Sequence, residues 1–248
     1  MARFYLDAPL PPGTRIVLPA ALAHHALRTL RLADGDALTL FNGQGGEVEA
    51  RLVAPRGASA SADLIAHLDR EAELPFRVIV GQGLSGGDKM DWTIEKAVEL
   101  GAAGIAPLAC ARSVVRLSGD RAERRVEHWR ALVAAACGQC GRNRLPEVQP
   151  PQSLTRWLGD LPADAVRLML APRATHSLVE EARALGMAGA PPAAPLYLLV
   201  GPEGGLAPDE EQAALSASFT PVHMGPRVLR TETAAAAALA MLAAVWAA

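Results

Sequence analysis

Residues 198–210 read LLVGPEGGLAPDE, and they carry the clearest indication of the fold class. An apolar run ends at a turn with three glycines, and a polar segment follows at once. Pro208 and the acids beside it suit the first turn of a helix, because proline has no amide hydrogen to lose there and the helix dipole favours negative charge. A strand that passes through a glycine-rich turn into a helix is typical of a parallel α/β sheet.

The flanking sequence repeats this alternation from residue 73 to residue 248. We expect strands at FRVIVGQG (76–83), GIAPLAC (104–110), VRLMLAP (166–172) and FTPVHMG (219–225). We expect helices over 89–101, 121–139 and 208–217, and an alanine-rich final helix from about Thr231. Glycine at position 101 suits the end of the first of these helices. The pattern predicts an α/β domain with a parallel sheet.

Residues 1–72 have a different pattern and predict a small β-rich domain. Short extended pieces at 15–19, 37–41 and 48–53 are separated by Asp34-Gly35 and Asn42-Gly43, which favour tight turns. We expect one short helix over 21–30 and a loop over 56–63. The segment DREAELP (69–75) is the expected linker.

Composition excludes several classes of protein. Three cysteines in 248 residues do not form a disulfide framework, and the first residues show no signal peptide. The uncharged tract 234–248 is too short to span a bilayer. Cys137 and Cys140 lie at the C-terminal end of a predicted helix and lack two further ligands, which argues against redox and metal sites. We therefore expect a cytoplasmic protein with no membrane segment and no metal.

Charge is concentrated in one part of the chain. The formal net charge is -2, yet residues 112–144 hold eight arginines and three acids, about +5. Such a segment is typical of a surface that faces phosphates, although a solvated helix face accounts for residues 121–130 nearly as well.

Two glycine-rich turns follow predicted strands. The first, Gly81–Gly86, has the spacing of a dinucleotide fingerprint, but no acid ends the next strand to hold a ribose. It suits either an NAD-linked oxidoreductase or close packing of a loop. The second, Gly201–Gly205, places one acid among three glycines at the carboxyl end of a strand, where α/β sheets bind ligands.

A third element, MGPRVLRTET (224–233), leaves a strand and enters the final helix. Thr231 and Glu232 suit a helix start as cap and first-turn acid. Arg230 does not, because its positive charge opposes the helix dipole. A residue placed against local preference indicates a ligand.

Five segments together resemble one known family. They are HHALRTLRLADGD (24–36), GGDKMDWTIEKAVELG (86–101), CGQCGRNRLPEV (137–148), LLVGPEGGLAPDE (198–210) and MGPRVLRTETAAAAAL (224–239). The residues of these segments and the order in which they occur resemble those of the RsmE family, the 16S rRNA (uracil-N3)-methyltransferases of the SPOUT superfamily.

The resemblance implies a PUA-like β-barrel over 1–72 that binds RNA. It also implies a SPOUT-type α/β methyltransferase domain over 73–248, tied in a C-terminal trefoil knot. It further implies a homodimer that acts on 16S rRNA or the small ribosomal subunit, with S-adenosyl-L-methionine as cofactor. The cofactor-binding residues implied by the resemblance are Leu170, Pro172, Val200, Gly201, Pro202, Glu203, Gly204, Met224, Gly225, Arg227, Val228, Leu229 and Thr231. Ala171 replaces the family's commoner histidine, and Met224 its usual leucine.

Arg230 and Glu232 are the catalytic candidates. Arg230 is expected to stabilise charge on the uracil oxygens, and Glu232 either to orient Arg230 or to accept the N3 proton. RNA phosphates are expected at Arg28 and Arg31, which share a face of the short helix, and at Arg142 and Arg144 in a short loop. Besides the NAD-linked oxidoreductase, a non-catalytic RNA-binding module stays open as an alternative.

Overall fold

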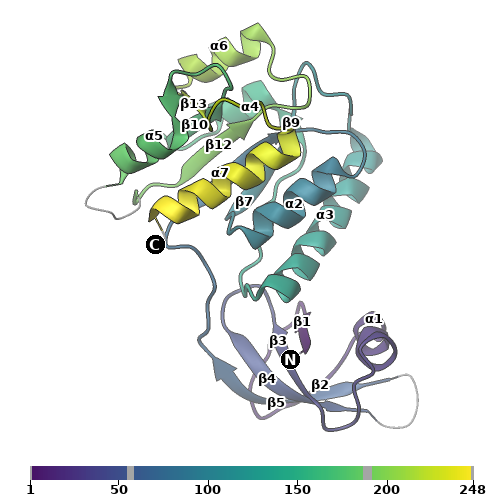
Figure 1. The fold of residues 1–248 in the computed structure, drawn as a ribbon. Coiled ribbons are helices and arrows are strands. Elements are labelled where there is room, and N and C mark those ends of the chain that lie inside the picture. The colour runs from purple at the N-terminus through teal and green to yellow at the C-terminus, as the bar shows by residue number, and fades with distance from the viewer. Residues whose placement is uncertain (1, 55–58, 187–191, 247–248) are drawn as a thin grey trace. The chain divides into compact units, whose positions relative to one another are not determined.

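The computed structural model describes residues 2–54, 59–186 and 192–246 (Figure 1). The chain forms two compact units. The first comprises Met1–Glu73 and Ala134–Leu145, and the second comprises Leu74–Val133 and Pro146–Ala248. The first unit therefore contains a second piece of chain, in addition to the residues that precede the expected boundary.

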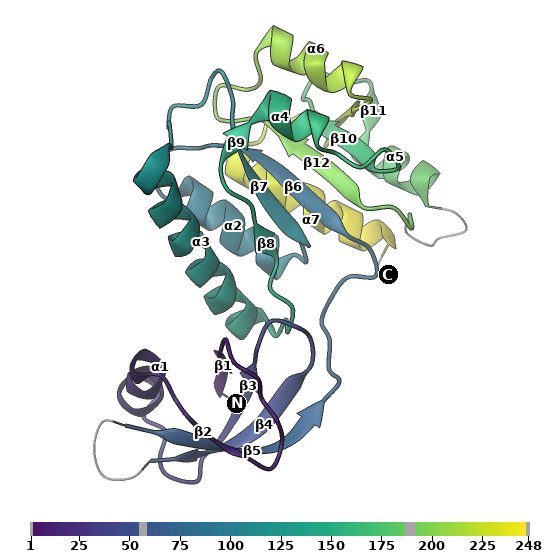
Figure 2. The ribbon, with the colours of Figure 1, turned by 180° about the vertical axis from the view of Figure 1, so that it is seen from behind.

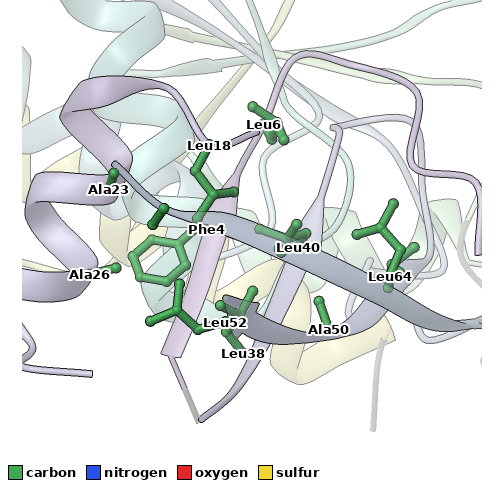
Figure 3. Packing of buried hydrophobic residues seen from close by; sticks show 13 residues of the cluster. Phe4, Leu6, Leu18, Ala23, Ala26, Leu38, Leu40, Ala50, Leu52 and Leu64 are labelled. Atoms are coloured by element: carbon green, nitrogen blue, oxygen red, sulfur yellow. The ribbon is translucent and has the colours of Figure 1, made fainter. Parts of the chain in front are cut away.

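The first unit is built on a five-stranded sheet in the order β1-β3-β4-β5-β2. Its elements are β1 (Ala2–Tyr5), β2 (Arg15–Val17), α1 (Ala20–His24), the π-helix η1 (His25–Thr29), β3 (Ala37–Phe41), β4 (Glu47–Val53) and β5 (Ser61–Leu68). Alternate strand residues such as Leu38, Leu40 and Leu52 turn inward, and Ala23 and Ala26 of the helical segment cover them (Figure 3). Closure of this sheet into the expected barrel stays a prediction.

Two local expectations in this unit are wrong. The expected loop 56–63 includes three residues outside the described ranges, and Ser61–Asp63 begin β5. Small side chains disguised this strand, because Ala60 and Ala62 pack in the core at 2% and 0% exposure. Arg31 lies beyond the helical segment with a φ of 56°, so it does not share a helix face with Arg28.

The second unit is an all-parallel sheet in the order β11-β13-β10-β12-β6-β7-β8, with β9 also paired to β7. Its strands are β6 (Val78–Gly83), β7 (Gly104–Ala109), β8 (Glu147–Val148), β9 (Gln152–Ser153), β10 (Val166–Leu170), β11 (His176–Ser177), β12 (Leu196–Val200) and β13 (Thr220–His223). This confirms the parallel α/β sheet predicted from the alternation.

Helices cover both faces of this sheet (Figures 1 and 2). They are α2 (Lys89–Glu99), α3 (Gly119–Cys140), α4 (Leu154–Gly159), α5 (Leu178–Leu185), α6 (Pro208–Ser216) and α7 (Thr231–Trp246). The helices α2 and α7 pack together on one face, and α4 and α6 lie on the other. No helix within the described residues is long and apolar enough to cross a membrane. The expected trefoil knot stays a prediction.

Sequence explains the ends of the helices that flank the site. The helix α2 buries Met90, Ile94 and Val98 at helical spacing, and Gly101 follows it with a φ of 87°, as expected of a left-handed terminating residue. In α6, Pro208 occupies the first turn and Glu210 accepts a hydrogen bond from the amide of Ala207 at 2.9 Å. These ends fix the loops that enter and leave the sheet.

Candidate functional site

A cavity of about 460 Å³ lies where three neighbouring strands end. The strand β10 pairs in parallel with β12 on one side and β13 on the other, so Leu170, Val200 and His223 end at the same edge. The carboxyl ends of parallel strands are where α/β sheets bind ligands, because the loops there diverge and leave a crevice. The volume suits a nucleotide-sized molecule.

The structure brings the expected residues of the second unit together. All of the cofactor-binding and catalytic candidates line this one cavity: Leu170, Pro172, Val200, Gly201, Pro202, Glu203, Gly204, Met224, Gly225, Arg227, Val228, Leu229, Arg230, Thr231 and Glu232. They come from three loops that are spread over residues 170–232 of the chain. Neighbouring strands, and not sequence proximity, make them one site.

Several lining residues are not among those expected from the sequence. They include Lys89, Met169, Leu206 and His223. For Lys89 a signal existed, since GGDKM follows β6 and begins α2. To place Lys89 in the site from this segment, one must know that β6 pairs with β12, and only the structure shows that pairing.

Glycines of the first glycine-rich turn allow two loops to pack against each other. A Cβ added at Gly83 would lie 2.4 Å from the backbone nitrogen of Pro202. A Cβ added at Gly81 would lie 2.5 Å from the ring of Trp157. Protein atoms therefore fill the space that a pyrophosphate would need at these two glycines. This geometry favours the packing interpretation over the NAD-linked one.

A buried chain of hydrogen bonds joins the two loops that form most of the cavity. The amide nitrogen Nε2 of Gln82, a residue with 0% exposure, donates to Oγ1 of Thr231 at 2.8 Å. That hydroxyl donates to the carbonyl oxygen of Gly201 at 2.6 Å. Thr231 is the first residue of α7, and its side chain holds the neighbouring loop, so it is not the side-chain cap that its position suggested. No sequence pattern singles out Gln82 for this role.

The acid at the tip of the second turn is held by the β6–α2 loop. Oε1 of Glu203 accepts hydrogen bonds from the backbone N–H of Gly86 at 3.0 Å and from Nζ of Lys89 at 3.1 Å. Burial raises the pKa of Glu203, but the hydrogen bonds from its own backbone, from Gly86 and from Lys89 outweigh burial and lower the pKa. Glu203 is thus an ionised clamp between two loops as well as part of the cavity wall.

The loop after β7 braces the same turn from outside. Arg112 donates to the carbonyl oxygens of Gly204 at 3.1 Å and Leu206 at 3.0 Å. Oε1 of Glu210 accepts from the backbone N–H of Ala111 at 2.7 Å. These hydrogen bonds fix the carbonyl groups of Gly204 and Leu206 and the N–H group of Ala111. The cavity wall is therefore preorganised.

The two catalytic candidates differ in their surroundings. Arg230 is exposed at the cavity, and within the described residues its guanidinium has no ion pair. The oxygen Oε2 of Glu232 is buried and has no hydrogen-bond partner in the described structure. A buried oxygen without a partner is costly, so it indicates a group that a ligand completes. The expectation that Glu232 orients Arg230 has no support from a contact between them.

The RNA-binding candidates all lie in the first unit, and the structure separates them. Arg28 and Arg31 are exposed. Arg144 is half exposed and forms an ion pair with Glu71 at 3.1 Å. Arg142 is only 3% exposed, and its Nε donates to Glu73 at 2.9 Å. Its guanidinium is enclosed by protein, so this geometry does not favour the expectation that Arg142 binds a phosphate, which stays a prediction.

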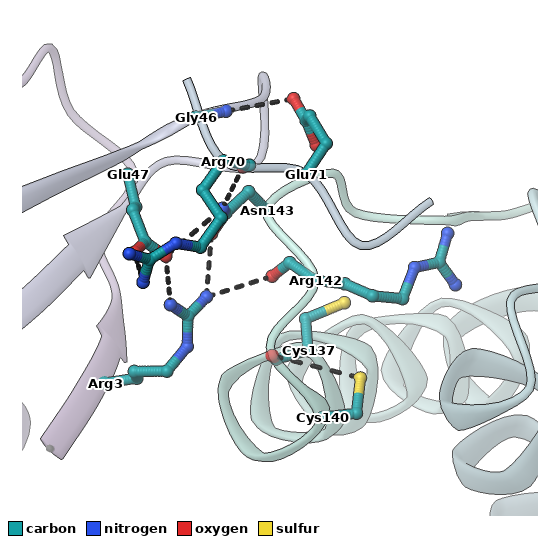
Figure 4. A network of polar contacts seen from close by, with 9 residues as sticks. All are labelled: Arg3, Gly46, Glu47, Arg70, Glu71, Cys137, Cys140, Arg142 and Asn143. Atoms are coloured by element: carbon teal, nitrogen blue, oxygen red, sulfur yellow. Dashed lines mark hydrogen bonds and ion pairs between the residues drawn. The ribbon is translucent and has the colours of Figure 1, made fainter. Parts of the chain in front are cut away.

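The loop that holds Arg142 is part of a buried polar network (Figure 4). Glu47 is 2% exposed and binds Arg3, Arg70 and the side-chain amide of Asn143. Burial raises the pKa of Glu47, but its hydrogen bonds to Arg3 and Asn143 prevail and lower it. The loop that holds Arg142 and Asn143 therefore stabilises the fold of the first unit.

Two of the cysteines, Cys110 and Cys137, are buried. Burial raises the pKa of both Cys110 and Cys137 to about 12. A thiol with so high a pKa carries almost no thiolate at neutral pH, so neither of these two residues is a nucleophile.

Known proteins share both the sequence and the fold. A family described as an RNA methyltransferase domain matches residues 72–243, and one described as an RNA methyltransferase PUA domain matches residues 18–62. The Ribosomal RNA small subunit methyltransferase E of Bacillus subtilis is 31% identical over 220 residues, which cover 88% of this chain and 86% of that protein. The chain belongs to the RsmE family. This membership confirms the expected family.

Other members of the RsmE family extend the match. The protein from Mycobacterium bovis is 35% identical over 242 residues, with 95% of this chain and 88% of its own length covered. The crystal structure of the RsmE protein of Neisseria gonorrhoeae, bound to S-adenosyl methionine, has a TM-score of 0.89 and 34% identity. It covers 99% of this chain and 98% of that one. The SPOUT-type α/β domain with a preceding PUA-like β domain is confirmed.

Proposed function

We propose that this chain transfers a methyl group from S-adenosylmethionine to N3 of one uridine in the 16S ribosomal RNA of the small subunit. The observation that carries the proposal is the convergence of three loops, 170–172, 200–206 and 224–232, on one cavity at the ends of β10, β12 and β13. Membership of the RsmE family and the ligand of the Neisseria relative support it.

The residues present fit this cofactor. The turn 201–205 needs glycines, since a Cβ at Gly201 would lie 3.2 Å from the amide nitrogen of Leu206, and Gly205 has a φ of 69°. Such a turn brings backbone N–H and C=O groups close to a ligand. The loops 200–206 and 224–231 would hold the nucleotide.

The chain's own residues would prepare the nucleophile. When bound, S-adenosylmethionine supplies a methyl group that is activated by the positively charged sulfur to which it is attached. This sulfur is a good leaving group because it departs as a neutral thioether. Glu232 would accept the proton from N3 of the uracil, and Arg230 would stabilise the negative charge that then spreads to the uracil oxygens. N3 would form its new bond to the methyl carbon as the bond from that carbon to sulfur breaks. The buried oxygen of Glu232 supports its role as base over a role in orienting Arg230.

The proposal includes the molecular setting. The substrate would be 16S rRNA or the small subunit in the cytoplasm, and the active form would be a homodimer. Light scattering of the purified protein should give twice the chain mass of 25.9 kDa. A monomer that methylates rRNA at full rate would remove the dimer from the proposal.

Three measurements test the function itself. Calorimetry should detect binding of S-adenosylmethionine, and mass spectrometry of small-subunit rRNA from a strain without the protein should show one missing methyl on a uracil. Arg230→Ala should lower kcat about 10² to 10³-fold, as the loss of a charge-stabilising group does, with Arg230→Lys retaining more activity. Glu232→Gln should lower kcat about 10²-fold or more with a small change in KM for the cofactor.

The alternative functions give different results. A protein that binds rRNA but transfers no methyl group would be a non-catalytic binding module. Undiminished methylation by Arg230→Ala would remove the catalytic role of that residue.

A further inference from the structure

A second cavity, of about 470 Å³, lies between the β6–α2 loop and the first half of α3. Its apolar residues are Leu84, Met90, Val115, Leu117 and Trp129, and its basic residues are Arg121, Arg124, Arg125 and His128. No carboxylate lines it, and none of these residues belongs to the first cavity. The proposed cofactor site leaves this feature unexplained.

One acid anchors part of the basic set. Asp91 of α2 accepts hydrogen bonds from His128 at 2.8 Å and from the indole nitrogen of Trp129 at 2.9 Å, and it forms an ion pair with Arg125 at 3.1 Å. These contacts join α2 to α3, which lie side by side (Figures 1 and 2). They engage both carboxylate oxygens of Asp91.

Arg121 and Arg124 are the cations that remain. Both are exposed on the first two turns of α3, and within the described residues neither has a hydrogen bond or an ion pair. Together with Arg125 they give the lining a charge of +3, of which Asp91 offsets one. A net positive rim above an apolar floor is the chemistry that recognises a nucleotide, because guanidinium forks match phosphate oxygens and the sugar or base covers apolar surface.

The two cavities share a wall. Lys89 lines the first cavity, and Ser85, Gly87 and Met90 line the second, so the single loop from β6 into α2 separates them. The hydrogen bond from Gly86 to Glu203 fixes this loop to the wall of the first cavity. A strand of RNA that reaches one cavity therefore passes close to the other.

We propose that this second cavity binds a phosphodiester of single-stranded substrate RNA beside the target uridine, with Arg121 and Arg124 as the phosphate ligands. The inference rests on the proposed function, because it assigns a place to the flanking nucleotide of that substrate. It makes these two arginines binding residues in the second unit, in addition to the exposed arginines of the first.

The test is the double variant Arg121→Ala/Arg124→Ala, with Arg130→Ala as the matched control. Arg130 is exposed on the same helix but does not line the cavity. Alanine is the best helix former, so neither variant should disturb α3, and circular dichroism checks this. The probes are a 16S rRNA transcript and an eight-nucleotide oligouridylate, titrated at several salt concentrations, with inorganic phosphate as competitor.

The double variant should bind both RNA probes at least about tenfold more weakly. Loss of two phosphate contacts should also flatten the slope of log K against log salt by about 1.4, from about 0.7 for each contact to a single strand. Calorimetric binding of S-adenosylmethionine should be unchanged, and Arg130→Ala should bind RNA like the wild type.

Equal weakening by the control and the double variant would overturn the proposal, because it would mean that only general charge matters. Unchanged binding by the double variant would overturn it as well. Millimolar phosphate that displaces neither probe but binds in the cavity would mark a free-anion site, and would also refute the assignment to RNA. Methylation of rRNA by the wild-type protein tests the proposed function separately, because the RNA affinities can be measured whether or not the protein transfers a methyl group.

Discussion

Replacement of Thr231 by valine tests the buried hydrogen bonds that join the two main loops of the cavity. Valine has nearly the same shape, so the packing is kept while the hydroxyl is lost. The carbonyl oxygen of Gly201 loses its donor at 2.6 Å, and Nε2 of Gln82 loses its acceptor at 2.8 Å. Each buried group left without a partner costs about 1–3 kcal/mol, although Nε2 of Gln82 keeps its bond to the carbonyl oxygen of Gly83 at 3.1 Å. We expect the free energy of unfolding to fall by about 2–4 kcal/mol.

The assay is urea unfolding of the Thr231→Val and Thr231→Ser variants side by side. Serine keeps the hydroxyl and removes one methyl group from a site with 8% exposure, which should cost about 1 kcal/mol. Affinity for S-adenosylmethionine should follow the same order, with the valine variant weaker, because Thr231 and Gly201 both line the cavity. If the two variants unfold at the same urea concentration, the hydroxyl does not hold the loops together and the reasoning is refuted.

Three further outcomes follow from the contacts. Gly83→Ala should destabilise the protein by about 1–3 kcal/mol or more, since the new methyl would meet the backbone of Pro202, whereas Gly159→Ala, with open space around it, should cost nothing measurable in thermal unfolding. Because the pKa of Glu47 is lowered in the folded protein, its contribution is full above its ordinary pKa of 4.5 and is lost as pH falls through the lower folded value; Glu47→Gln should remove this acid-range dependence from urea unfolding. Arg142→Ala should lower the free energy of unfolding by about 1–3 kcal/mol, because the partly buried carboxylate of Glu73 loses its guanidinium partner, with no change in the salt slope of RNA binding.

The sequence predicts much of the second unit because its signals are local. Apolar runs that end at glycines mark strand ends, and parallel strands bring such ends to one edge, so the loops around Gly201 and Met224 could be expected in one site. The order of the strands is not a local property. That β10 lies between β12 and β13 follows from packing of the whole sheet, and no periodicity reports it.

The residues that sequence reasoning missed or misplaced depend on tertiary partners. Gln82 looks like one more residue of a glycine-rich turn, yet it is enclosed and joins two loops. Arg142 looks like a basic loop residue until Glu73 is found beside it. Charge in a sequence shows what a side chain could bind, whereas burial decides what it does bind.

The division of the first unit into two stretches of chain has a consequence for biosynthesis. Glu47 needs Asn143, and Arg142 needs Glu73, so a nascent chain of 73 residues lacks half of these pairs. The amino-terminal unit cannot finish folding until the ribosome has added residue 145, well into the other unit. It is therefore poorly suited to gene fusion or domain shuffling, and a graft of residues 1–73 onto another enzyme should require residues 134–145, the end of α3 and the loop after it, as a second, separately encoded insert.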